Sequence, residues 1–285
     1  MPNSLIRTTR SRRCPICKKP DWCSVSSNGD YAICMRVRDG CHKVTSNRGY
    51  LHFTNGSRPK KMELVELPKK SKPPSRDWSA LEHIYYAGLQ ALPGRLDQLS
   101  SKGGLGGAEP LGLLRAGWIS NARAYSFPMR DASGRTVGIH LRYLDGSKLC
   151  MKGSSLAMFV PGNFPDLAPD RLYICEGASD TAVILDRGLR AIGRPSNVGG
   201  LGMIVDYCKS QKNEEIVLVC DRDKPGTHAA ECTERGRREL VSSLKAARCA
   251  RTIKSIRPPG HNDVKEWGPT RETIEAVTCS ARVIR

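Results

Sequence analysis

The stretch EEIVLVCDRD (214–223) runs from a block of apolar residues directly into two aspartates, Asp221 and Asp223. A second stretch, RLYICEG (171–177), has the same design and reaches Glu176. Short apolar runs that alternate with helical patterns are typical of a mostly parallel sheet with helices on both faces. The other elements that we expect are strands at 190–192 and 251–256 and helices near 180–187, 201–210 and 227–247. The sequence therefore predicts an α/β domain over residues 169–285.

The three acids that follow these strands are the first candidates for a functional site. The carboxyl ends of neighbouring parallel strands form the ligand crevice of an open sheet, so Glu176, Asp221 and Asp223 should converge there. Clustered carboxylates repel one another unless a cation lies between them, and oxygen-only ligands favour Mg²⁺ or Mn²⁺. The sequence therefore predicts a Mg²⁺ or Mn²⁺ site at this edge of the sheet.

Two further acids are candidates for the same site. Asp180 begins the helix after Glu176, where it either caps the helix or supports a metal from outside the ligand shell. Asp263, in PPGHNDVKEW (258–267), follows the last expected strand and is a candidate metal ligand that completes the crevice. Between Glu176 and Asp180, Gly177 permits a sharp turn and a close approach to a phosphate.

Five of the twelve cysteines lie within 28 residues of the N-terminal part of the chain. Cys14 and Cys17 form a metal knuckle, and Cys34 is the obvious third ligand. The fourth ligand is either Cys23, on an expected strand, which we favour, or Cys41. Unliganded thiols in a small core are the alternative, but so short a module has too little apolar content to fold without a stabilising cross-link such as a metal. Four thiolates leave no open position, so zinc here would be structural.

The charge of the chain indicates a polyanionic partner. The formal net charge is +18, and residues 1–76 carry 17 Lys and Arg against 5 Asp and Glu, a net of +12. Such an excess is typical of proteins that bind nucleic acid. In the cysteine-rich module, Trp22 and Tyr31 either stack on bases of a single strand or pack in the fold.

Composition also sets the organisation of the chain. We expect a zinc-ribbon DNA-binding domain at 1–57, a Pro- and Lys-rich linker at 58–76, a basic α+β subdomain at 77–168 and the α/β domain at 169–285. Within the subdomain, the sequence predicts a helix over 78–96, a glycine-rich loop at 101–110 and a hairpin over 124–144 that turns at 131–134. The start lacks a signal peptide, and no apolar stretch has the roughly 20 residues of a membrane helix. We therefore expect a cytoplasmic protein with no membrane contact.

The Glu176-Gly177 and Asp221-Arg222-Asp223 motifs resemble those of the TOPRIM fold, which bacterial DnaG-type primases, phage primase-helicases and topoisomerases share. The stretch SFPMRDASGRTVGIHLRYLDGSKLCMKGSS (126–155) resembles the basic subdomain that precedes TOPRIM in primases. A zinc ribbon and a linker in front complete the order of a primase. The resemblance spans nearly the whole chain and departs from the family in its cysteine spacing and in CMKG (150–153) where the family has a KYLN-like string.

The resemblance implies a DNA primase of phage or mobile-element type, a nucleotidyltransferase that makes short RNA primers for DNA replication. It implies single-stranded DNA as template, ribonucleoside triphosphates as substrates and, since no helicase domain follows, a replicative helicase acting in trans. By the same resemblance, Asp221 and Asp223 bind the metal and Glu176 is a ligand or base. Arg142 and Lys152, together with Lys224, then neutralise phosphate charge.

Two other functions fit parts of the sequence. A non-catalytic relative of primases would occupy single-stranded DNA or a helicase without polymerising, although such a protein has no need for intact acids. A TOPRIM nuclease would use the acids but would leave the zinc ribbon and the basic hairpin unexplained. The five acids thus predict a metal crevice, and the modules around it favour a primase.

Overall fold

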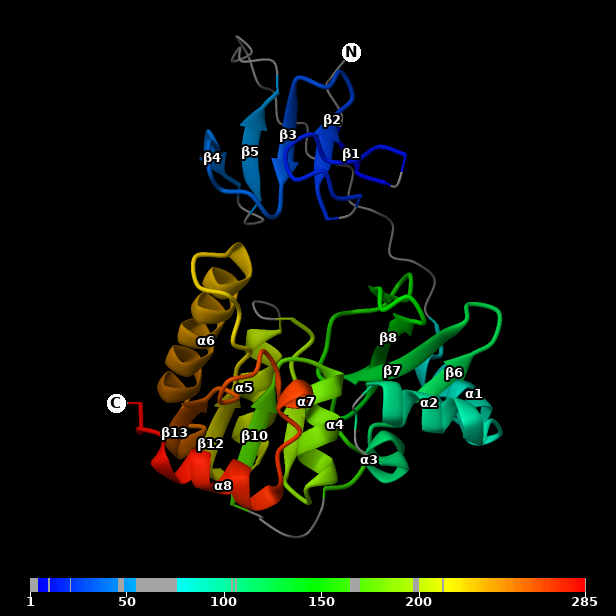
Figure 1. Ribbon diagram of the computed structural model, residues 1–285, viewed down its shortest axis with the longest axis vertical. Coiled ribbons are helices and arrows are strands. Elements are labelled where there is room, and N and C mark those ends of the chain that lie inside the picture. Colours follow the sequence, from blue (N-terminus) through cyan, green and yellow to red (C-terminus); the bar gives the residue numbers. More distant parts are fainter. Residues whose placement is uncertain are drawn as a thin grey trace. The chain divides into compact units, whose positions relative to one another are not determined.

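The computed structural model describes residues 5–9, 11–20, 22–45, 49–54, 76–103, 105, 107–164, 170–196, 200–211 and 213–284. The chain forms two compact units, Met1–Pro73 and Pro74–Arg285 (Figure 1). The predicted linker at 58–76 lies, apart from Arg76, outside the described residues. The predicted domain boundaries stay predictions.

The first unit is a small antiparallel sheet with the strand order β1-β2-β3-β5-β4. Its strands are two to four residues long, too short to enclose a large apolar core. The buried sulfurs of Cys14, Cys23 and Cys34 form the centre of one hydrophobic cluster instead. The strands are β1 (Leu5–Arg7), β2 (Ser24–Ser26), β3 (Tyr31–Cys34), β4 (Lys43–Val44) and β5 (Tyr50–Phe53).

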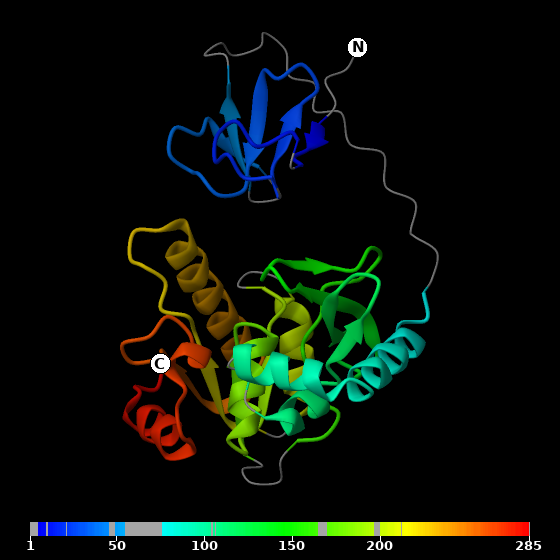
Figure 2. The same cartoon turned by 45° about the vertical axis from the view of Figure 1, so that its right-hand side comes forward.

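The second unit begins with three helices and a four-stranded antiparallel sheet of order β6-β7-β8-β9 (cyan and green in Figure 2). The predicted hairpin is present and turns at Asp131 to Gly134. The elements are α1 (Trp78–Gln90), α2 (Pro93–Gly103), α3 (Ala108–Leu113), β6 (Gly117–Ile119), β7 (Ala124–Arg130), β8 (Thr136–Tyr143) and β9 (Lys148–Cys150).

Two predictions in this region were partly wrong. The single helix expected over 78–96 is divided between α1 and α2, because the chain turns at Ala91 and Leu92 before Pro93 opens the next helix. The segment 101–110 is not simply a loop, since both of its ends are helical. Leu105 between them is fully buried in the core, so tertiary packing overrides the glycine-rich composition.

The rest of the second unit is a parallel sheet of order β11-β10-β12-β13. The ends of all four strands lie within one residue of the predicted positions. The elements are β10 (Arg171–Cys175), α4 (Ala178–Asp186), β11 (Ala191–Gly193), α5 (Leu201–Ser210), β12 (Asn213–Val219), α6 (His228–Ala246), β13 (Ala250–Ile256), α7 (Val264–Trp267) and α8 (Arg271–Ser280).

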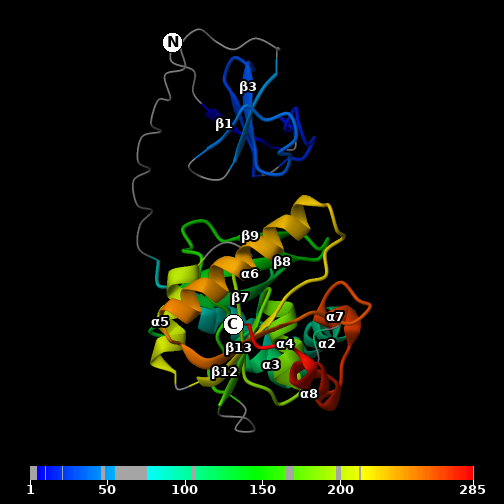
Figure 3. The same ribbon diagram turned by 90° about the vertical axis from the view of Figure 1, so that its left-hand side faces the viewer.

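Helices cover both faces of this sheet, which confirms the predicted fold class. On one face, Tyr173 of β10 shares a core with Ile274 of α8 and with apolar residues of α4. On the other face, Ile174 shares a core with Leu240 of α6 and with apolar residues of α5. Figure 3 shows α5 and α6 on one side of β12 and β13, and α4 and α8 on the other. None of the described helices is both long and apolar enough to cross a membrane.

The topology places a ligand crevice between β10 and β12. The chain leaves β10 toward β11 on one side and then crosses to β12 on the other, and ligands bind at such a reversal of strand order. Gly177, the second residue after β10, has φ +114°, a conformation that disfavours any side chain. A Cβ on Gly193 of β11 would lie 2.8 Å from the carbonyl oxygen of Gly177, so the close packing requires a glycine at 193, whereas the backbone conformation favours one at 177.

Candidate active site and cysteine cluster

The carboxyl edge of the parallel sheet gathers most of the predicted acids. Glu176 follows β10, Asp221 follows β12 after one residue, and Asp263 caps the N-terminus of α7 after β13. These three and Asp180 of α4 line one crevice of about 290 Å³. Asp223 lines a second, larger cavity, which Asp221 also lines. Among the predicted acids, Asp221 is the one that borders both described cavities.

Glu176 is held by a buried ion pair. Arg194, the first residue after β11, lies 2.7 Å from its carboxylate, and both side chains are only 2% exposed. Burial raises the pKa of Glu176, and the guanidinium of Arg194 opposes that rise. Arg194 was not predicted as a site residue. Its place at the end of an expected strand, beside the strand that leads to Glu176, is the signal that would have found it.

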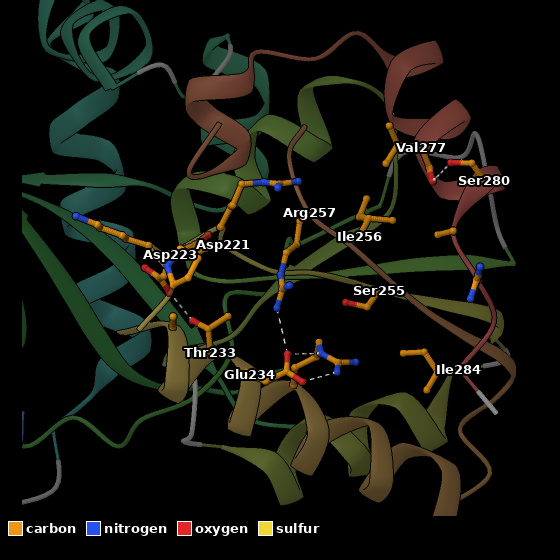
Figure 4. A pocket seen from close by; sticks show the side chains of 17 residues that line it. Asp221, Asp223, Thr233, Glu234, Ser255, Ile256, Arg257, Val277, Ser280 and Ile284 are labelled. Carbon is orange, nitrogen blue, oxygen red and sulfur yellow. Dashed lines mark hydrogen bonds and ion pairs between the residues drawn. The ribbon is translucent and has the colours of Figure 1, made fainter. Parts of the chain in front are cut away.

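Asp223 is held by a hydroxyl group. Thr233 of α6 is 1% exposed and donates a hydrogen bond of 2.8 Å to Asp223 Oδ2 (Figure 4). The same hydroxyl lies 3.5 Å from Glu176 Oε2. Thr233 thus contacts acids from two strands. The sequence carries no signal for this role, because Thr233 lies inside a long helical pattern.

Asp180 and Asp221 are acids in surroundings that oppose their charge. Burial, and then Asp263, raise the pKa of Asp180 to about 7. Burial, and then Glu176, raise the pKa of Asp221 to about 8. Asp180 Oδ1 is buried and has no hydrogen-bond partner among the described residues. The helix cap before Asp180 is Gly177, so Asp180 is not the cap that one interpretation expected.

These features fit a divalent cation of the Mg²⁺ or Mn²⁺ type. The donors are all carboxylate oxygens, which these hard cations prefer. A cation between the carboxylates would stabilise their ionised form, which the raised pKa values of Asp180 and Asp221 show to be unfavourable without it. It would also give the buried Asp180 Oδ1 a partner.

Basic side chains line the same crevice as the acids. Arg142 of β8 lines it and donates a hydrogen bond of 2.9 Å to Ser179 Oγ at the start of α4. Lys148 and Lys265 also line it, and neither was predicted. His140 beside them is neutral at physiological pH, because burial and then Lys148 lower its pKa to about 4. The crevice thus pairs a basic wall with an acidic one.

The other two predicted basic residues lie elsewhere. Lys152 is exposed after β9 and is not among the residues that line either described cavity. Lys224 is exposed and lines the larger cavity with Asp223. Their contacts with phosphate stay predictions.

In the first unit, the sulfurs of Cys14, Cys17, Cys23 and Cys34 all lie within 4.8 Å of one another. The Cys17–Cys23 and Cys23–Cys34 sulfur distances are 3.7 and 4.0 Å. Zn–S bonds of about 2.3 Å place tetrahedral sulfurs roughly 3.8 Å apart, so the cluster suits structural zinc. Cys41 is outside this group.

The surroundings of the sulfurs also suit thiolates. The backbone N–H groups of Arg36 and Val37 point at the Cys34 sulfur, at 3.4 and 3.3 Å. The Arg36 guanidinium lies 3.8 Å from the sulfurs of both Cys17 and Cys23. These donors would offset the negative charge of four thiolates around one zinc ion.

An antiparallel subdomain followed by a parallel sheet with acids at its carboxyl edge is the fold of a TOPRIM catalytic core, here preceded by a zinc-ribbon-like unit. No protein-family model and no curated protein matches the chain. Solved structures to which it is similar include several primases.

Three of these primase structures show the extent of the similarity. The chain has a TM-score of 0.56 and 14% identity to the zinc-binding and RNA polymerase domains of the Aquifex aeolicus primase, over 73% of this chain and 60% of that one. It has a TM-score of 0.53 and 16% identity to the DnaG catalytic core, over 72% and 79%. The values for a DnaG primase catalytic domain bound to single-stranded DNA are 0.51 and 17%, over 72% and 80%. The chain therefore has the fold of the primase catalytic core.

Proposed function

We propose that the protein is a DNA primase that synthesises short RNA primers on single-stranded DNA by metal-dependent nucleotidyl transfer. The observation that carries the proposal is the crevice that Asp180, Asp221 and Asp263 line together with Arg142 and Lys148. Acids that hold divalent cations, opposite cations that hold phosphate, are the arrangement that phosphoryl transfer requires. The fold supports primase over other TOPRIM chemistries, since several similar structures are primases and one of them is bound to single-stranded DNA.

In this proposal, Glu176, Asp221 and Asp223 would hold Mg²⁺ or Mn²⁺, with Asp180 and Asp263 beside them. The cations would supply charge neutralisation for the triphosphate and would favour ionisation of the attacking 3′-hydroxyl. Side chains of the protein would bind the substrate and position the metal ligands.

The basic wall would bind and orient the incoming ribonucleoside triphosphate. Arg142, fixed by Ser179, presents a rigid guanidinium to the phosphates, and Lys148 adds a mobile charge. Both would stabilise the charge that develops as pyrophosphate leaves. Lys152 and Lys224 would extend the contact along the nucleic acid. The two fixed acids, Glu176 and Asp223, are held by Arg194 and Thr233, so the metal ligands are positioned before substrate arrives.

The first unit would read the template. Zinc on Cys14, Cys17, Cys23 and Cys34 would hold its short strands together. Trp22 is 61% exposed at a φ of +68°, so its ring is available for a base to stack on. Tyr31 is 4% exposed and packs in the fold instead. A replicative helicase in trans and a phage or mobile-element origin remain parts of the proposal that rest on the resemblance alone.

A priming assay on a library of single-stranded DNA templates tests the proposal. The protein is given labelled ribonucleoside triphosphates with Mg²⁺ or Mn²⁺, and the expected products are short oligoribonucleotides. The double variant Asp221→Asn/Asp223→Asn should lose synthesis by at least about a thousandfold and keep binding to single-stranded DNA. No product with any template or metal, while DNA is still bound, would favour the non-catalytic binding protein. Metal-dependent degradation of the DNA without synthesis would favour a nuclease.

A further inference from the structure

The larger cavity, of about 1,090 Å³, is lined by Asp221 and Asp223 but not by Arg142 or Lys148 (Figure 4). We call it the α6–β13–α8 groove, after the elements that carry most of its lining. Asp221 and Asp223 border it directly. A ligand in this groove would therefore share Asp221 with a ligand in the crevice and would meet Asp223 as well.

The groove changes in chemistry along its length. Figure 4 shows Asp221 and Asp223 at one end, Glu234 and Arg257 in the middle, and Ile284 at the far end. Five cations line it against three carboxylates, a net charge of +2: Arg222, Lys224, Arg237, Arg257 and Arg282 against Asp221, Asp223 and Glu234. An anion is therefore the kind of ligand that the middle of the groove attracts.

Two arginines of the groove are fixed by one carboxylate. Arg237 and Arg257 lie 2.6 and 3.1 Å from the oxygens of Glu234. Hydrogen bonds from Arg237, against a smaller effect of burial, lower the pKa of Glu234 to about 2, so the carboxylate stays ionised. Arg238 also bonds Glu234, but it is 74% exposed and lies outside the groove.

This cluster is more than a charged helix face. Pairs of Glu and Arg three or four residues apart are common on solvated helices and contribute little. Arg257, however, follows β13 and reaches the same carboxylate from another element. Side chains of Arg237 and Arg257 are 22% and 43% exposed, so their guanidiniums are partly removed from water. Two guanidiniums on one carboxylate leave donors to spare for a phosphate.

Primer synthesis without a primer needs two nucleotides at the same acids. One nucleotide supplies the 3′-hydroxyl and the other supplies the α-phosphate, so the two must approach the metal from different sides. The crevice of about 290 Å³ offers room for one of them. The groove, which shares Asp221 with the crevice, offers the place for the other.

We propose that the α6–β13–α8 groove binds the initiating nucleoside triphosphate, with its 3′-hydroxyl at Asp221 and Asp223 and its triphosphate on Arg237 and Arg257. This inference rests on the proposed primase function. In the first step the 3′-oxygen forms a bond to the α-phosphorus of the nucleotide in the crevice, and the α–β phosphoanhydride bond breaks. Pyrophosphate leaves with the bonding electron pair, and the hydroxyl proton passes to water. The base of the initiating nucleotide stays at the open side, where a template can pair with it.

Binding stoichiometry tests the groove without any catalysis. The full-length protein is titrated with a 3′-deoxynucleoside triphosphate and Mg²⁺ by equilibrium dialysis, and we expect two nucleotides per chain. Arg237→Ala/Arg257→Ala should lose one of them and Arg142→Ala/Lys148→Ala the other, each with a roughly tenfold to hundredfold weaker Kd. Arg238→Ala is the matched control, since it removes a partner of Glu234 outside the groove, and it should keep both.

Kinetics give a second, independent readout. For Arg237→Ala/Arg257→Ala we expect KM for the initiating triphosphate to rise by about tenfold to a hundredfold, while extension of a dinucleotide with a 5′-hydroxyl is unchanged. Lysines at both positions should restore part of the affinity, which separates lost charge from lost folding. Inorganic triphosphate should compete for the groove in the wild-type protein.

Several outcomes would overturn the inference while leaving primer synthesis intact. One nucleotide per chain, unaffected by the groove variants, would show that the groove holds no nucleotide. If Arg237→Ala/Arg257→Ala lost initiation and extension equally, the two arginines would not be specific to the initiating nucleotide. If inorganic triphosphate displaces no nucleotide, or if the groove binds single-stranded DNA and no nucleotide, the groove has another ligand. Two bound nucleotides without any synthesis would instead count against the primase proposal and support the groove.

Discussion

The cysteine cluster and the acid cluster organise their candidate metal sites in opposite ways. Four sulfurs lie within 4.8 Å of one another, and among the described residues no other set of three or more ligand atoms is so close. The acids are spread over two cavities, and two of them are held by Arg194 and Thr233. A closed set of ligands can hold a metal for structure, whereas a spread set leaves room for substrate oxygens.

The comparison predicts that the sulfur cluster determines whether its unit folds. Cys23→Ser should lose the zinc and unfold the first unit, because structural zinc supplies about 10–16 kcal/mol in small modules. Cys41→Ser, a change of the same chemistry outside the cluster, should keep the zinc. Atomic absorption measures the metal, and circular dichroism with limited proteolysis measures the fold. Zinc retained in Cys23→Ser and lost in Cys41→Ser would reverse our assignment of the fourth ligand.

For the parallel sheet and its acid cluster, the sequence predicts some parts better than others. The strands of the parallel sheet were predicted to within one residue, because each is a continuous apolar run of strand length. Glu176, Asp221 and Asp223 could be singled out as candidates because they follow such runs, and their roles stay predictions. Thr233, Lys148 and the arginines of the groove were not, because only tertiary packing brings them to the acids. Leu105 was missed for the same reason, since its burial depends on distant elements.

The acid cluster should depend on protein cations for stability when metal is omitted. Arg194→Met leaves Glu176 buried and unpaired, so we expect a loss of about 3–5 kcal/mol in the free energy of unfolding of the second unit. Urea titration without Mg²⁺ measures it. Arg194→Met/Glu176→Gln removes the stranded charge as well and should recover most of the loss. Solvent-exposed ion pairs contribute less than about 1 kcal/mol. A loss of unfolding free energy below that value in Arg194→Met would show that the Arg194–Glu176 pair is not desolvated.

The acids should also make the second unit sensitive to pH when metal is omitted. The pKa of Asp221 is raised to about 8 and that of Asp180 to about 7. Between the usual carboxyl pKa near 4 and these values, the folded state keeps protons that the unfolded state has lost. These two acids should therefore make stability fall as the pH rises, by up to about 1.4 kcal/mol per pH unit for each group, and His140, whose pKa is lowered to about 4, should offset part of this fall below about pH 6.5.

Thermal unfolding across pH 4–9 measures this dependence. Asp221→Asn should flatten the profile, and Mg²⁺ should flatten it in the wild-type protein, because both remove the penalty of ionisation. Asp206→Asn, an exposed acid on α5, is the matched control and should leave the profile unchanged. Stability that rises with pH would contradict the direction of the pKa shifts.

The smallest expected effect isolates how one acid is positioned. Thr233→Val is nearly isosteric and removes only the hydroxyl that donates to Asp223, so the fold should persist. Supporting contacts of this kind change metal affinity or activity by about 10-fold to 100-fold. We therefore expect the Mg²⁺ concentration for half-maximal primer synthesis to rise, with KM for nucleotide little changed, and Thr233→Ser to restore it. If Thr233→Ser fails to restore the Mg²⁺ dependence that Thr233→Val changes, packing of the methyl group is responsible and the hydroxyl is not. The acids of the second unit would then depend less on individual protein contacts than their spread geometry indicates.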